Sequence, residues 1–195
     1  MIIITGGTGL LGSQIVDRLL DRVPADQVGV SVRDTARAAN LAARGVRVRR
    51  GDFTDPGSLA GAFEGASQVL IVSTDRTGEE AVAQHVAAID AARDAGAKRI
   101  LYTSHQAAAE DSVFAPMPDH AATEHYLSKT GTPFTALRNG FYAGTVRHLL
   151  GRALETGELV APADGPVSWT HTPTWPRPLR RSSPTRAAST ARPRR

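Results

Sequence analysis

Three glycines near the start of the chain constrain its fold more than any other feature. Residues 1–5, MIIIT, are almost continuously apolar, as in a parallel strand that is covered on both faces. Gly6, Gly9 and Gly12 follow at three-residue intervals and open a helical stripe of apolar residues. In this setting Gly6 permits a tight turn, Gly9 lets the backbone approach a diphosphate, and Gly12 lets the helix pack closely on the strand. A tight turn alone would also favour glycine, but it does not require three at this spacing. The loop therefore predicts a dinucleotide-binding βα unit with phosphates at the helix N-terminus.

Strand-like and helical segments alternate along most of the chain. Strands are predicted at residues 1–5, 27–33, 46–52, 67–74, 98–104 and 133–140. Helices are predicted at residues 12–22, 34–45, 56–65, 78–95, 119–129 and about 143–155. Alternation at this spacing indicates the α/β class, as a Rossmann-type doubly wound parallel sheet with helices on both faces.

The chain divides into one domain and a tail of different composition. Residues 1–167 are predicted to form a single NAD(P)-binding domain. Residues 168–195 hold seven arginines, five prolines and no acidic residue, and we expect them to be disordered. The formal net charge of +4 misrepresents the domain, because residues 1–167 alone hold more acidic than basic side chains.

The composition argues against several classes of site and location. The chain has no cysteine, which excludes disulfides and thiolate chemistry. Its six histidines show no ligand spacing, so we expect no metal site. The N-terminal apolar run lacks a basic segment and a cleavage site, and no apolar run approaches the ~20 residues of a membrane span. We therefore expect a soluble, cytoplasmic protein with no membrane partner.

The end of the second predicted strand suggests which dinucleotide binds. An NAD site usually has an acidic residue there, whereas this chain has Arg33, with Arg37 one helical turn later. A guanidinium suits the 2′-phosphate of NADP(H), so we expect NADP(H) to be preferred over NAD(H). Asp34 is better explained as the cap of the following helix. The alternative for Arg33 is a solvated charge at the end of a strand.

Several segments together resemble a known family. TGGTGLLG, VLIVST, RILYTS and TPFTALRNGFYAG resemble the NmrA-like branch of the atypical short-chain dehydrogenases, and most of all its bacterial NADPH-dependent quinone reductases. The resemblance covers residues 1 to about 169. It implies hydride transfer from NADPH to a quinone-like acceptor, or to an azo or carbonyl compound. The residues that the motifs place at the cofactor are Gly6, Thr8, Gly9, Leu10, Leu11, Gly12, Arg33, Arg37, Asp52, Phe53, Ser73, Thr74, Thr103 and Ser104.

The catalytic pair of ordinary short-chain dehydrogenases is not reproduced. Those enzymes use Tyr-x-x-x-Lys, whereas the sequence here is YLSK, with Tyr126 and Lys129 one residue too close. Spacings of three and four share a helix face, so a role is not excluded, but an ordinary surface pair is the favoured interpretation. Atypical family members lack the pair.

Candidate residues for the reaction follow the fifth and sixth strands, where ligands meet open α/β sheets. His105, Asn139 and Phe141 are expected to line the pocket of a small-molecule acceptor. His120 and Tyr142 are the candidate catalytic residues for proton supply. For His120 the alternative is a surface pair with Glu124, one helical turn away.

The sequence leaves a second class of function open. The family also includes proteins that bind NADP and control a transcription factor without catalysis, so a non-catalytic NADP(H)-sensing regulator is the alternative. A homodimer is a further possibility. No motif in the sequence separates the enzyme from the sensor.

The basic tail, residues 168–195, has three interpretations. A basic arm could bind phosphates, but the stretch lacks lysine and interleaved aromatic residues, so we expect no nucleic-acid partner. It could also be a tail without function. Our hypothesis is a shifted reading frame. One choice of GC-rich synonymous codons for THTPTWPRPLRRSSPTR, read without its first two bases, encodes PHADLAEAAPAVLADE, and the family resemblance leads us to expect such an alanine-rich helix there. A chain cut short in this way is expected to bind NADP(H) weakly and to turn over poorly.

Overall fold

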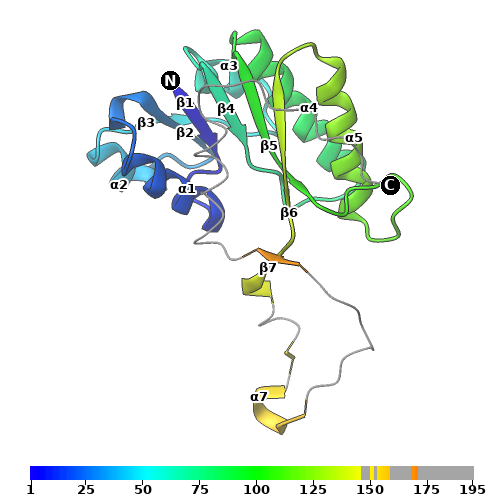
Figure 1. Ribbon diagram of the computed structural model, residues 1–195. Helices are drawn as coiled ribbons and strands as arrows, with labels where there is room; N and C mark the ends of the chain where they lie inside the picture. The colour runs from blue at the N-terminus through cyan, green and yellow to red at the C-terminus, as the bar shows by residue number, and fades with distance from the viewer. Residues whose placement is uncertain (146–149, 152, 159–167, 171–195) are drawn as a thin grey trace.

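Six parallel strands form the centre of the computed structural model, which describes residues 1–145, 150, 151, 153–158 and 168–170. The strand order is β3-β2-β1-β4-β5-β6, so the chain moves outward in one direction from β1 and then in the other (Figure 1). The predicted α/β class and the doubly wound parallel sheet are therefore confirmed. The strands are β1 (Ile2–Thr5), β2 (Val28–Val32), β3 (Arg47–Arg50), β4 (Gln68–Ile71), β5 (Arg99–His105) and β6 (Phe134–Asn139).

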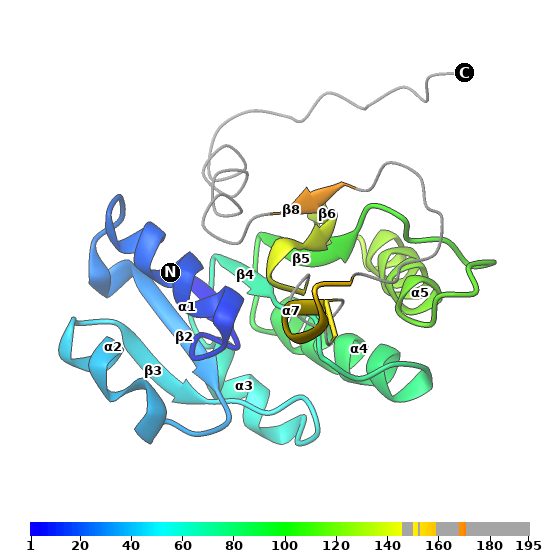
Figure 2. The ribbon, with the colours of Figure 1, turned by 90° about the horizontal axis from the view of Figure 1, so that it is seen from below.

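Helices cover both faces of this sheet (Figure 1; Figure 2). One face packs against α1 (Leu10–Leu20) and α2 (Ala39–Ala43). The other face packs against α3 (Gly57–Phe63), α4 (Glu79–Asp94) and α5 (Pro116–Lys129). Short 3₁₀ turns are η1 (Ala25–Gln27), η2 (Ala36–Ala38) and η3 (Ala143–Thr145).

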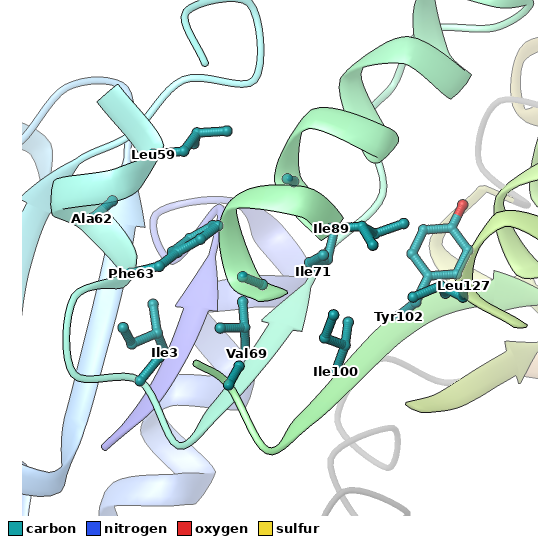
Figure 3. Packing of buried hydrophobic residues seen from close by; sticks show 14 residues of the cluster. Ile3, Leu59, Ala62, Phe63, Val69, Ile71, Ile89, Ile100, Tyr102 and Leu127 are labelled. Carbon is teal, nitrogen blue, oxygen red and sulfur yellow. The ribbon is translucent and has the colours of Figure 1, made fainter. Parts of the chain in front are cut away.

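The first strand explains why its sequence is continuously apolar. Successive side chains of a strand point to opposite faces. Ile3 belongs to the cluster under α3, α4 and α5, and Ile4 to the cluster under α1 and α2; both are fully buried. In the first of these clusters, Ile3, Val69 and Ile100 come from three neighbouring strands and face Phe63, Ile89 and Leu127 on the helices (Figure 3).

The expected helices differ from the structure in their bounds, and the one expected at residues 34–45 is η2 followed by the short α2. The helix expected from residue 119 begins at Pro116, because proline at the first helical position lacks only an N–H group that has no helical acceptor there. Of the helix expected at about 143–155, the described residues form η3 and the short α7 (Ala153–Thr156).

A small second sheet joins the end of β6 to a segment that the sequence assigned to the tail. β7 (Phe141–Tyr142) pairs in parallel with β8 (Trp169–Thr170). The Phe141 N–H donates to the Ser168 carbonyl at 3.1 Å, and the Gly140 N–H donates to the Thr170 hydroxyl at 2.9 Å. The expectations for the rest of the tail, residues 171–195, lie outside the described residues.

The turn between β1 and α1 requires glycine at two positions, for two different reasons. Gly6 has a φ of 61°, in the left-handed region that favours glycine. Gly12 lies against it, since a Cβ atom at Gly12 would stand 2.2 Å from the Gly6 carbonyl oxygen. This is the close packing of helix on strand that the glycine spacing predicts.

A substitution at Gly12 tests this packing. We expect Gly12→Ala to lower the free energy of unfolding by roughly 2 kcal/mol, because the methyl group forces α1 away from backbone atoms that cannot yield. The matched control is Gly61→Ala in α3, where an added Cβ meets nothing within 4 Å. That control should be neutral or stabilising by up to about 1 kcal/mol through helix propensity. Urea unfolding of both variants measures the difference, and equal stabilities would contradict the contact.

Candidate functional site

The glycine loop lies where the strand order reverses, between β1 and β4. The Gly6 N–H donates to the Ser31 carbonyl at 2.9 Å, and the Gly9 N–H donates to the Gly6 carbonyl at 2.9 Å, which fixes the turn. The backbone bond from Ser13 to Gly9 (3.0 Å) is the first helical bond of α1. The N–H groups of the preceding turn have no helical acceptor, so they and the helix dipole favour an anion at this end of α1. In a doubly wound sheet this crevice is the place where ligands bind.

The end of β2 and the turn after β3 bring opposite charges together. Arg33 and Arg37 are exposed, and the Asp34 carboxylate accepts from the Ala36 N–H at 2.9 Å, in keeping with its expected role at the helix start. The Asp52 carboxylate accepts from the N–H and the hydroxyl of Thr54 at 3.0 and 2.9 Å. The Thr54 backbone bond and the nearby Arg33 charge lower the pKa of Asp52, so its carboxylate stays ionised.

Three consecutive backbone N–H groups after β4 are held by side chains from three other elements. The Val72 N–H donates to the Thr5 hydroxyl at 2.8 Å and the Ser73 N–H to the Thr103 hydroxyl at 2.8 Å. The Thr74 N–H donates to His85 Nε2 at 3.0 Å. The Thr103 hydroxyl in turn donates to Ser73 Oγ at 3.0 Å. These hydrogen bonds hold the loop after β4 in place beyond the point where strand pairing ends.

Ser104 points away from Thr103, as successive residues of a strand must. Its hydroxyl donates to Glu124 Oε1 at 2.5 Å, and Arg138 donates to Glu124 Oε2 at 2.5 Å. Glu124 therefore joins α5 to β5 and β6 instead of pairing with His120. The surface pair of His120 with Glu124, the alternative that helical spacing left open, is not formed, because Ser104 and Arg138 on the sheet bind the carboxylate.

His120 instead lies in a buried polar cluster, together with Tyr102, His85 and Thr123. The Tyr102 hydroxyl is 2.8 Å from His120 Nδ1 and 3.3 Å from His85 Nδ1. His85 Nδ1 is 3.0 Å from the Thr123 hydroxyl, which donates to the Asp119 carbonyl at 2.8 Å. Burial, and then the charge of His120, lower the pKa of His85 to about 4. Burial raises the pKa of Tyr102, so its phenol keeps its proton.

A pocket of about 150 Å³ opens beside this cluster. It lies between the loop after β4 and the start of α5. Its position at the carboxyl ends of the strands, next to the loop that holds Ser73 and Thr74, makes it accessible from the ligand side of the sheet. Its lining residues are Thr74, Asp75, Arg76, Thr77, His85, Pro116, Asp119 and His120.

Aromatic side chains gather after β5 and β6. The His105 and Phe141 rings meet edge to face, with centroids 4.9 Å apart, and Phe141 also contacts Phe114 and Trp169, at 5.9 and 6.1 Å. His105 in turn stacks with His120, with ring centroids 6.5 Å apart. These rings form a partly exposed aromatic surface beside the polar cluster.

Asn139 and Tyr142 lie next to each other at the end of β6. The Asn139 side-chain amide donates to the Tyr142 hydroxyl at 3.4 Å. Burial raises the pKa of Tyr142, so the phenol stays protonated at neutral pH. The residues predicted for an acceptor pocket, His105, Asn139 and Phe141, therefore share one corner of the sheet with Tyr142.

The YLSK segment has a structural explanation. The Tyr126 hydroxyl donates to Asp90 on α4 at 2.8 Å, so this side chain joins α5 to α4. Lys129 is the last residue of α5. This bond supports the interpretation of Tyr126 as an ordinary structural tyrosine.

Sequence reasoning missed His85, Tyr102 and Thr123. A signal existed for His85, because it interrupts the buried stripe of α4 formed by Ala81, Ala88 and Ala92. A polar residue on a buried helix face must find a hydrogen-bond partner. The identity of that partner depends on the tertiary structure.

The described residues include neither a metal-binding group of side chains nor a membrane-spanning helix. Within that part of the chain, no three histidine or acidic side chains are grouped so that they could hold a metal ion. No helix there has the length and apolarity that a membrane crossing needs.

Residues 6–157 match the model of the NAD(P)H-binding family. The chain is 39% identical over 171 residues to quinone oxidoreductase 2 of Escherichia coli (strain K12), which covers 86% of this chain and 58% of that protein. It is 31% identical over 173 residues to an NmrA-like family domain-containing oxidoreductase of Aspergillus flavus, with 86% and 56% covered.

Solved structures share the fold. Triphenylmethane reductase of Citrobacter sp., complexed with NADP(H), superposes with a TM-score of 0.82 at 37% identity, over 90% of this chain and 63% of that chain. The chain thus spans about three fifths of the length of the relatives it matches.

The buried state of His85 gives a pH dependence of stability. The unfolded chain takes up a proton at His85 near its usual pKa of 6.5, whereas the folded chain does so only near pH 4. Stability is therefore unaffected by His85 above about pH 6.5 and falls by about 3 kcal/mol as the pH drops to about 4. Urea unfolding across this range measures the loss. In His85→Gln the dependence should be clearly weaker, and an unchanged slope in that variant would contradict the assignment.

Proposed function

The chain belongs to the NAD(P)H-binding, NmrA-like family, and from this premise we propose that it is an NADPH-dependent oxidoreductase with a quinone-like acceptor. One observation carries the proposal: the glycine loop and the first turn of α1 lie at the reversal of strand order, at the same edge of the sheet as the aromatic surface after β5 and β6. An anion-binding turn beside a surface for a flat conjugated molecule suits hydride transfer between two planar rings.

The residues present fit a dinucleotide. The first-turn N–H groups of α1, held at the end of β1 by the close contact of Gly12 with the Gly6 carbonyl, suit a diphosphate. When bound, NADPH supplies the hydride, and the protein's task is to bind, orient and exclude water. We assign the following residues to the cofactor by their positions at strand ends and in the loop: Gly6, Thr8, Gly9, Leu10, Leu11, Gly12, Asp52, Phe53, Ser73, Thr74, Thr103 and Ser104.

Arg33 and Arg37 are the basis for a preference for NADP(H) over NAD(H). The end of β2 presents exposed guanidinium groups, and the one acidic side chain next to Arg33 is engaged by the Ala36 N–H. A 2′-phosphate can accept charge-assisted hydrogen bonds from a guanidinium, whereas ribose hydroxyls need an acidic acceptor.

The acceptor is proposed to lie against the aromatic surface, with His105, Asn139 and Phe141 in its pocket. Tyr142 and His120 are proposed to donate to the acceptor oxygen. The Tyr142 phenol stays protonated at neutral pH. Quinone oxidoreductase 2 and triphenylmethane reductase are relatives whose names specify conjugated acceptors, which supports a quinone-like molecule here. Azo and carbonyl compounds are the other acceptors of this chemistry.

A charge substitution tests the cofactor preference. We expect Arg33→Ala to weaken NADPH binding about tenfold or more, because a charge-assisted hydrogen bond is worth roughly 1.5–3 kcal/mol, and to leave NADH binding nearly unchanged. The control is Arg22→Ala, which removes an equal charge beyond the other end of α1. Fluorescence titration with both cofactors gives the affinities. Tighter binding of NADH than of NADPH by the wild-type chain would overturn the assignment.

The reaction itself is tested by NADPH oxidation in the presence of a water-soluble benzoquinone. The expected result is a slow, quinone-dependent loss of reduced nicotinamide absorbance that saturates with both substrates, because the chain is expected to turn over poorly. Tight NADPH binding without turnover on quinone, azo or carbonyl acceptors would instead favour the NADP(H)-sensing regulator.

A further inference from the structure

In the buried polar cluster behind the pocket, each hydrogen bond has a definite donor and a definite acceptor. It begins at Thr74, whose backbone N–H can only donate. His85 Nε2, 3.0 Å away, is therefore the acceptor, and the proton of the neutral ring is on Nδ1. Thr123 gives the same answer independently. Its hydroxyl proton goes to the Asp119 carbonyl, so its oxygen accepts from His85 Nδ1–H at 3.0 Å.

The proton of His85 then decides the direction of the Tyr102 hydroxyl. Tyr102 has two histidine neighbours, His85 Nδ1 at 3.3 Å and His120 Nδ1 at 2.8 Å. Because His85 Nδ1 already carries a proton, the phenol proton goes to His120. His120 Nδ1 is consequently an acceptor, and the proton of its neutral ring is on Nε2. The Tyr102 ring itself is fixed in the apolar cluster beside Leu127 (Figure 3).

We propose that Thr74, His85 and Tyr102 hold His120 as a neutral imidazole with its proton on Nε2, and that this N–H donates a hydrogen bond to the acceptor oxygen. The role at the acceptor rests on the proposed function, whereas the tautomer assignment does not. His120 is then a catalytic residue that contacts the acceptor. Tyr102 and His85 are positioning residues that act through it.

The two carboxylates of α5 nearest His120 have hydrogen-bond partners other than its imidazole. On α5, Asp119 accepts from the Gly78 N–H at 2.8 Å, and Glu124 accepts from Ser104 and Arg138. Asp75 and Arg76, from the loop after β4, line the same pocket.

The stacked His105, from the end of β5, adds no carboxylate that could stabilise an imidazolium. Burial, and then the charge of His105, lower the pKa of His120, and they outweigh the opposite effect of the Glu124 and Asp119 carboxylates. A proton on His120 Nδ1 would also reverse the bond to Tyr102, so that the ring donates to the phenol oxygen and the phenol proton loses its acceptor at 2.8 Å.

A neutral N–H donor suits reduction of a carbonyl or quinone oxygen. The hydride brings an electron pair and one hydrogen to the acceptor, and negative charge develops on its oxygen. The fixed N–H of His120 stabilises that charge without losing its proton, and the proton that completes the alcohol or hydroquinone comes from water. The cluster cannot act as a proton wire, because it ends at a backbone N–H that has no proton to give.

The wild-type chain alone tests the tautomer assignment. Nitrogen-15 NMR of the histidine side chains, in the cofactor-free protein at neutral pH, should show His85 protonated on Nδ1 and His120 protonated on Nε2. A His120 ring protonated on Nδ1, or on both nitrogens, would overturn the proposal whatever the activity.

A matched pair of tyrosine variants tests the positioning role. Tyr102→Phe removes the donor to His120, and Tyr126→Phe removes a hydroxyl of the same kind whose partner is Asp90. In Tyr102→Phe we expect mixed His120 tautomers and a His120 pKa closer to about 6.5. The pH dependence of kcat/KM should then follow the protonation of His120. In Tyr126→Phe the spectrum and the pH profile should match those of the wild type.

Removal of the donor itself measures its worth. We expect His120→Phe to lower kcat by about 100-fold with little change in NADPH affinity, as for loss of one fixed donor to a developing oxyanion. An unchanged kcat would refute the role of His120 at the acceptor. If no acceptor is reduced by the wild-type chain while the NMR tautomers are as stated, the proposed function fails and the tautomer assignment stands.

Discussion

The contact between the Gly6 carbonyl and the first turn of α1 determines the geometry of the rest of the site. The Gly9 N–H donates to this carbonyl at 2.9 Å, and Gly12 lies so close that no side chain fits. This contact brings the helix start to the end of β1, and the Gly6 bond to Ser31 ties the same turn to β2. An anion-binding helix end is thereby fixed at the reversal of strand order, where the sheet offers its crevice.

A second constraint follows from the end of β4. Buried N–H groups must be satisfied, at a cost of about 1–3 kcal/mol each if they are not. Val72, Ser73 and Thr74 find their acceptors in Thr5, Thr103 and His85. The last of these bonds fixes which nitrogen of His85 carries the proton. In the proposed mechanism, this requirement of backbone hydrogen bonding after β4 also sets which nitrogen of His120 carries the proton.

Much of the fold could be predicted, because its signals are local. The apolar run of β1, the alternation of strand and helix, and the glycines at positions 6 and 12 each act over a few residues and were interpreted correctly. Helical spacing left open whether His120 pairs with Glu124 on the surface. In the structure Glu124 turns to Ser104 and Arg138 on two strands, because α5 packs against the sheet and its carboxylate finds stronger donors there.

The sequence by itself determined the parallel α/β sheet, the glycine turn and the arginine at the end of β2, because periodicity and backbone sterics depend on residues that are close in sequence. Only the tertiary structure decided which polar side chains meet. Tyr102 on β5 is 17 residues from His85 on α4 and 18 residues from His120 on α5, and it contacts both. Their meeting depends on strand order and on the burial of two helices against one face, and no local pattern encodes the partner that a buried polar group will find.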